Sequence, residues 1–144
     1  MTAYAQLVIA ITLVILAALT TNQFNQQNKM SADIAIEQQV RSLAAYIDSA
    51  AEFKQKNNGA TGNITANIPL PAWMLARNGI TVYAEAGNYY VYLQNKPGLM
   101  TALRKKSFNS AKLGRIENST IKLTDGSIIN KPAVIPTNSL VYIL

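Results

Sequence analysis

The chain of 144 residues carries thirteen lysine and arginine residues against seven aspartate and glutamate residues, and 49% of it is hydrophobic. It contains no cysteine and no histidine, which excludes disulfides, thiol chemistry, the commonest zinc sites and every mechanism that uses an imidazole base. The length fits one modest domain beside an apolar N-terminal segment, and no cofactor is expected.

The first predicted element is an apolar helix over residues 3–21, a segment without any charged side chain. A helix of this length is roughly 28 Å long, close to the roughly 30 Å of a bilayer's hydrocarbon core. We therefore expect residues 1–21 to form a single transmembrane helix. Its anchoring residues are the large aliphatic ones, namely Leu7, Val8, Ile9, Ile11, Leu13, Val14, Ile15, Leu16 and Leu19.

Two other interpretations of this segment stay open. It could be the hydrophobic stem of a filament subunit, or a cleaved signal peptide, although no basic residue precedes it and no small-residue cleavage site follows. The side of the membrane is poorly determined by the residues, because Lys29 and Arg41 after the segment are accompanied by Asp33 and Glu37. The positive-inside rule counts the basic residues and gives only a weak lean toward a cytoplasmic body.

Residues 22–58 are predicted to continue the helix as an amphipathic extension. No proline or glycine interrupts the chain before Gly59, and apolar residues recur at spacings of four and three, the pattern of one helical stripe. We expect this stripe to pack on the protein's own sheet, with a short coiled coil to a second copy as the alternative. The packing stripe consists of Ile36, Val40, Leu43, Ile47 and Ala50.

Residues 59–144 are predicted to form an antiparallel sheet domain. The segments 80–86 and 88–94 are rich in β-branched and aromatic residues and meet at Gly87-Asn88, which is a hairpin signal. Because side chains alternate along a strand, Ile80, Val82, Ala84 and Ala86 are expected on one face and Thr81, Tyr83 and Glu85 on the other.

Three further elements complete the expected body. A short helix is predicted over residues 97–107, a second hairpin over 118–130 around Asp125-Gly126, and a last strand over 139–144. The predicted fold class is therefore α+β. A long N-terminal helix, membrane-spanning and then amphipathic, packs on a small antiparallel sheet with one further short helix.

Most of the positive charge lies late in the chain, where residues 87–144 hold eight basic residues against Glu117 and Asp125. A patch of this kind could bind anionic lipid, nucleic acid or an acidic protein surface, but we favour a solvated face of the domain. Nucleic acid is not an expected partner, because only Phe108 brings an aromatic ring near these cations. The candidate basic patch consists of Arg104, Lys105, Lys106, Lys112 and Arg115.

The aromatic residues of the body are expected to be structural. Trp73, the only tryptophan, is predicted to lie in the core, where it would close the gap between helix and sheet. Four tyrosines are expected to be half-buried strand residues with hydrated hydroxyls, with a stacking platform for bases or sugars as the alternative. These are Tyr83, Tyr89, Tyr90 and Tyr92.

Enzymatic chemistry is not expected. The glycines are scattered singly at turns, so no phosphate-binding loop is recognisable. Outside the long helix the carboxylates are Glu85, Glu117 and Asp125, and the last belongs to a predicted turn, so a paired acid and base is not indicated. The residues favour a membrane-tethered module that acts through binding or assembly.

The segment LPAWMLARNGITVYAEAGNYYVY, followed by PGLMTAL, Ser107, Ser110, Gly114 and the ending PAVIP…SLVYIL, resembles the small PilM proteins of type IVb pilus clusters on conjugative plasmids. These differ from the actin-like protein of the same name in type IVa systems. The resemblance implies a role in assembling the thin pilus used in conjugation, but it supplies no biochemical activity and no site residue. We expect an inner-membrane protein with a single span and a periplasmic body.

The architecture also resembles that of type IV pilins, in which an apolar N-terminal helix continues into an amphipathic half packed on a sheet. Pilins carry a glutamate in the first turns of this helix, where the present chain has the neutral Ala5. We therefore expect a membrane-anchored assembly factor that contacts pilin or pilus-assembly proteins and possible further copies of itself. A pilin-like filament subunit is the first alternative, and a tethered binder of anionic lipid or nucleic acid is the second.

Overall fold

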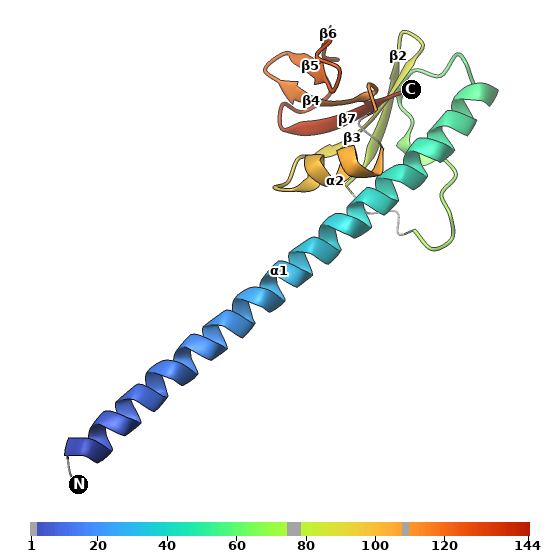
Figure 1. Ribbon diagram of the computed structural model, residues 1–144. Helices are drawn as coiled ribbons and strands as arrows, with labels where there is room; N and C mark the ends of the chain where they lie inside the picture. The colour runs from blue at the N-terminus through green and yellow to red at the C-terminus, as the bar shows by residue number, and fades with distance from the viewer. Residues whose placement is uncertain (1–2, 75–78, 108–109) are drawn as a thin grey trace. The chain divides into compact units, whose positions relative to one another are not determined.

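The structure is a computed structural model that describes residues 3–74, 79–107 and 110–144 (Figure 1). The chain divides into two compact units, Met1–Ala35 and Ile36–Leu144, and each is considered by itself. Residues 75–78 of the quoted PilM-like segment lie outside the described residues. The same is true of Phe108, the aromatic residue named beside the basic patch. The α+β fold class predicted from the sequence is confirmed.

Helix α1 spans Ala3–Lys56 without a break. It ends where Asn57, Asn58 and Gly59 follow, residues that favour the turn conformations that stop a helix. The Asn57 side chain donates a hydrogen bond to the Phe53 carbonyl oxygen at 3.1 Å and so satisfies one acceptor of the last turn. Lys54 and Lys56 in this turn complement the negative end of the helix dipole.

The second unit, which we call the body (residues 36–144), holds the sheet and one further α-helix. Helix α2 spans Leu99–Lys106, and η1 is a 3-10 turn over Thr65–Asn67. The strands are β1 (Gly62–Asn63), β2 (Thr81–Glu85), β3 (Asn88–Gln94), β4 (Leu113–Glu117), β5 (Thr120–Leu123), β6 (Ile128–Asn130) and β7 (Ser139–Ile143).

The seven strands form one antiparallel sheet in the order β1-β2-β3-β7-β4-β5-β6. The C-terminal strand β7 is therefore central, and it joins the β2–β3 hairpin to the β4–β5–β6 half. The first hairpin turns at Ala86 and Gly87, which both take positive φ angles, 51° and 81°. That conformation matches the twist of the flanking strands.

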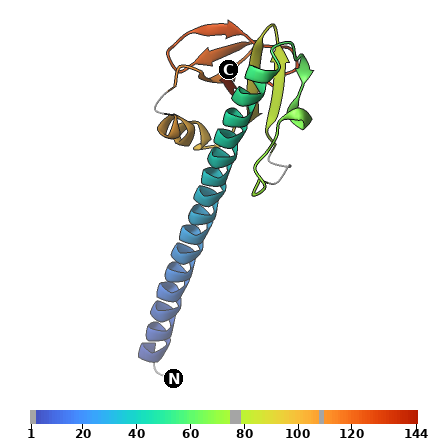
Figure 2. The same ribbon diagram turned by 90° about the vertical axis from the view of Figure 1, so that its right-hand side faces the viewer.

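The sheet carries a hydrophobic cluster on each face. On one face, alternate residues of β2, β3 and β7 pack against α1 from Val40 to Ala50 and against Leu99 and Leu103 of α2. Figures 1 and 2 show this part of α1 running beside α2 and the sheet. On the other face, Ile135 from the segment before β7 packs on a smaller cluster that includes Tyr90 and Ile121. The larger cluster gives the body its own core.

Candidate functional site

The first unit exposes its apolar residues on every side. The nine anchoring residues predicted between Leu7 and Leu19 are between 47% and 69% exposed. The hydroxyl of Thr12 donates to the Val8 carbonyl oxygen at 2.8 Å, and Thr20 and Thr21 bond back to the preceding turn in the same way. These bonds satisfy the three threonine hydroxyls within the helix, as a lipid environment requires.

Helix α1 is the one helix in the described residues that is long and apolar enough to cross a membrane. Its most apolar window has a mean hydropathy of 2.2 over 18 residues and is not buried by the rest of the chain. A signal sequence near the N-terminus passes the same test of length and composition, so this observation gives the helix the capacity to span and no more.

The predicted packing stripe lies on the side of α1 that meets the body's core. Val40, Leu43 and Ala50 belong to the hydrophobic cluster and are 7%, 1% and 0% exposed. Ile36 and Ile47 are half-buried against the same cluster. The sequence pattern missed Tyr46, which is 1% exposed and stands one position off the heptad seam.

A groove of about 210 Å³ opens in the body between α1, α2, β4 and β7. Its walls are mostly apolar and include Leu43, Leu103 and Leu113, while three polar residues also line it, Asp48, Lys106 and Ser107. The Ser107 Oγ atom is buried and makes no hydrogen bond within the described part of the chain. Sequence reasoning could not find this groove, because its walls come from four elements far apart in the chain.

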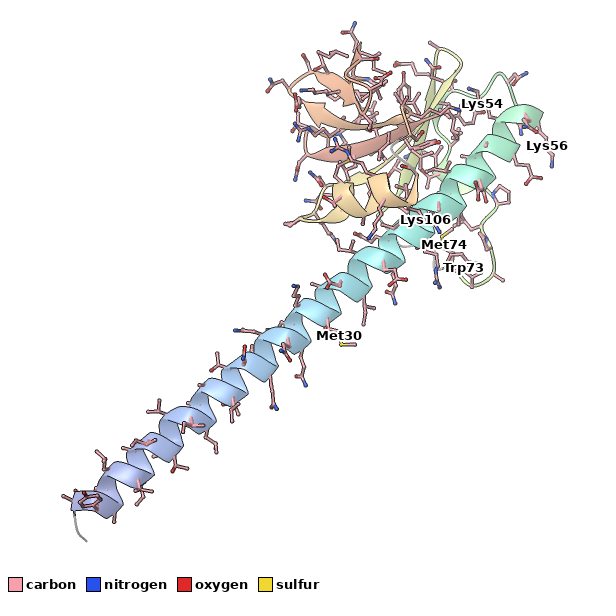
Figure 3. The ribbon with its side chains drawn as sticks, in the orientation of Figure 1. Met30, Lys54, Lys56, Trp73, Met74 and Lys106 are labelled. Carbon is pink, nitrogen blue, oxygen red and sulfur yellow. The ribbon has the colours of Figure 1, made fainter. Side chains whose placement is uncertain are left out.

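The predicted basic patch is exposed but is not one uniform cluster. Arg104, Lys105 and Lys106 form the last turn of α2, where they complement its helix dipole, and Lys112 is exposed in the connection to β4. Arg115 lies on β4 and forms an ion pair with Glu117, so its charge is partly neutralised. The free cations of the described patch are therefore concentrated at the end of α2, and Lys106 also lines the groove (Figure 3).

The prediction that Trp73 lies in the core is wrong, because its side chain is 58% exposed (Figure 3). The neighbouring Met74 is 8% exposed and packs in the large cluster with Leu70 at its edge. The Met74 backbone N–H donates to the Pro71 carbonyl oxygen at 3.0 Å, which forms a tight turn. This turn directs Met74 inward, and Trp73 therefore takes an exposed position.

The four tyrosines divide between the two faces of the sheet. Tyr83 and Tyr92 are half-buried as expected, and Tyr90 lies in the smaller cluster at 7% exposure. Tyr89 points to the opposite face, where its hydroxyl donates to the Asn57 carbonyl oxygen at 2.8 Å. Burial raises the pKa of the Tyr89 phenol above its ordinary value. Tyr89 therefore ties the end of α1 to β3.

Comparisons with known proteins identify the family of the chain. No curated protein matches the chain. The crystal structure of PilM from Escherichia coli B7A is similar, with a TM-score of 0.62 and 29% identity over 80% of this chain and 94% of that one. The model of the PilM family matches residues 8–143. The chain accordingly belongs to the PilM family.

Proposed function

We propose that this protein is a membrane-anchored accessory factor for the assembly of a type IVb, or thin, pilus used in conjugation. It would act by protein–protein contact rather than by catalysis. The observation that carries the proposal is an apolar helical segment exposed on every side, in a PilM family member whose body already has its own core. The body's core does not include this segment, and its exposed apolar surface is of the kind that a lipid bilayer covers.

The anchor is tested by placing a charge at the middle of the segment. Leu13→Arg puts a guanidinium near mid-bilayer, which costs about 2.5–3.5 kcal/mol on insertion scales. We expect less protein to remain in the membrane after an alkaline carbonate wash. Asn22→Arg, just beyond the apolar segment, is the matched control and should be retained like the wild type. Equal retention of Leu13→Arg and the control would count against the anchor.

The body supplies surfaces suited to contact with pilin or pilus-assembly proteins. Trp73 is an exposed aromatic side chain, a type that often dominates the energy of protein interfaces. The cations at the end of α2 can steer an acidic partner surface toward the body. We expect Trp73→Ala to lower pilus yield without changing the amount of protein in the membrane, and an unchanged yield would remove Trp73 from the proposed contact.

We place the body in the periplasm, with the inner membrane as the site of anchoring. The chain has no cysteine, so a single introduced thiol reports its own compartment. Asn58→Cys, in the exposed turn after α1, should react with a membrane-impermeant maleimide in spheroplasts with an intact inner membrane. Reaction only after the membrane is permeabilised would place the body in the cytoplasm.

A pilin-like filament subunit is the second candidate, and the unbroken helix α1 is the observation that favours it. In this case the apolar segment would leave the bilayer and pack among neighbouring subunits. Ala5 stands where pilins have their glutamate, which favours the accessory role instead. Purified, sheared pili and washed inner membranes from cells with a tagged chain separate the two. Signal confined to the membrane supports the accessory factor, whereas signal in the filaments supports the subunit.

A further inference from the structure

The body groove has the features of a site built for a protruding side chain. Its volume of about 210 Å³ exceeds the roughly 150 Å³ of an engineered apolar cavity that holds benzene, so it can accept a branched aliphatic group. Lys106 at its edge and the buried Ser107 hydroxyl both lack partners among the described residues. Arg104 and Lys105 add two exposed cations in the same helical turn. The complementary ligand is an aliphatic side chain with carboxylates close by.

Helix α1 carries one face with this chemistry. Met30, Asp33, Ile34 and Glu37 are spaced at i, i+3, i+4 and i+7, which places them on one side of a helix. All four are exposed, and Met30 and Ile34 are 66% and 47% exposed. Figure 3 shows the Met30 side chain pointing away from the helix. They follow the apolar segment of residues 3–21, so lipid does not account for them. We call these four residues the neck face.

We propose that the groove of one copy of this chain binds the neck face of a second copy. Ile34 enters the apolar groove, and Asp33 and Glu37 meet the cations at the end of α2. Arg41 continues the neck face by a further helical turn and provides a partner for Asp48, the one acidic residue that lines the groove. Each charged residue at the edge of the groove thus meets an opposite charge.

In this contact the two copies are offset from each other along the axes of their α1 helices. Placing Ile34 beside Ala44, which lines the groove, moves one α1 past the other by ten residues, or about 15 Å. Groove and neck face are different surfaces, so the contact is heterologous and each copy offers a free groove to the next. Repeating this contact gives a staggered, open-ended array of copies. Because such an array is a filament, this inference rests on the second candidate function, the filament subunit.

Cysteine cross-linking of the full chain in pilus-producing cells tests the contact. Ile34→Cys and Ala44→Cys in one chain lie about 15 Å apart along α1, too far for an internal disulfide, and the natural chain adds no thiol. Mild oxidation should therefore give a ladder of dimers and higher multimers. Ala32→Cys with Ala44→Cys is the matched control, because residue 32 lies on the opposite side of the helix from residue 34.

Charge reversal separates specific docking from chance collision. We expect Lys105→Glu with Lys106→Glu to lower the cross-linked fraction by about tenfold, since like charges facing each other across an interface oppose association. Adding Asp33→Lys and Glu37→Lys to this variant should restore the cross-linked fraction. Lys96→Glu with Lys122→Glu changes the net charge equally at two exposed positions outside the groove and should leave cross-linking unchanged.

A ladder that depends on the Ile34→Cys substitution and follows the charge reversals supports the proposal. No ladder, an equal ladder from the Ala32→Cys control, or cross-linking of position 44 to a different protein alone would overturn it. The same cells are fractionated without oxidant to locate the chain. A chain found in filaments without the cross-link refutes the neck contact but leaves the subunit role standing, whereas a chain found only in membranes without the cross-link refutes both.

Discussion

Gly114 is the position in the body where adding one carbon atom should cost most. It lies in β4, paired with Val141 of the central strand and with Leu123 of β5. A Cβ atom at this position would lie 2.8 Å from Cγ2 of Ile121 and 2.9 Å from Cδ2 of Leu123. It would also lie 3.0 Å from the Lys122 carbonyl oxygen. These distances are well inside the roughly 3.5–4.0 Å at which carbon atoms attract one another.

The cost of Gly114→Ala follows from how far these neighbours can move. The two side-chain carbons can turn away, but Ile121 is fully buried in the smaller cluster, and the carbonyl oxygen belongs to the β4–β5 ladder. Overpacking of this kind costs about 1–3 kcal/mol. Alanine also stiffens the unfolded chain, which returns about 0.4–1 kcal/mol. We therefore expect the free energy of unfolding to fall by about 1–2 kcal/mol.

Urea unfolding of the full chain in a neutral detergent, followed by the near-ultraviolet circular dichroism of its tyrosines, measures this loss. For a slope of about 2 kcal/mol per molar urea, the midpoint should fall by about 0.5–1 M with the slope unchanged. Gly59→Ala is the matched control, because its Cβ would meet nothing within 4 Å and its φ is not left-handed. A Gly114→Ala midpoint equal to or above that of the control would refute the reasoning.

Three further changes test the core, the link between α1 and β3, and a turn. Leu43→Ala should lower the free energy of unfolding by about 2–5 kcal/mol in the same urea assay, because the side chain is 1% exposed. Tyr89→Phe should lower it by about 0.5–1.5 kcal/mol, because it leaves the Asn57 carbonyl oxygen without its hydrogen bond. Hydrogen bonds from the Ser127 hydroxyl and backbone N–H lower the pKa of the Asp125 carboxyl below its ordinary 3.8. The carboxylate therefore stabilises the fold above that value and loses its effect as the pH falls through the lower folded pKa. Asp125→Asn should accordingly lower the urea midpoint at pH 7, and the difference from the wild type should shrink as the pH is lowered below 3.8.

The elements that the sequence predicted well are those with local signals. The helix end after Lys56 follows from Asn and Gly, and the β2–β3 hairpin follows from the turn signal at Gly87-Asn88 between β-branched runs, although the turn itself lies one residue earlier, at Ala86 and Gly87. The hairpin around Asp125-Gly126 is present as β5 and β6. In each case the residues that form the element also mark its limits, so no distant contact was needed to find it.

The features that sequence reasoning missed depend on distant contacts. Strand β4 contains a glycine and two charged residues in five positions, so its propensity is poor, and it is a strand because β5 and β7 pair with it on both sides. The prediction that Trp73 is buried was wrong for a related reason. Hydrophobicity favoured burial, but the turn at Pro71 gives the core position to Met74 instead. The groove likewise exists only after α2 and β7 have met α1.

The central place of β7 sets the order in which the chain can reach its final state. Residues 3–21 leave the ribosome before the strands do, and a segment of this length and apolarity is ready for a membrane as soon as it emerges. The sheet cannot close at that stage, because β3 and β4 are joined only through β7, which ends at Ile143. Contacts over so long a sequence separation form late and slowly. Under the proposed membrane anchoring, capture of the apolar segment would therefore precede completion of the core.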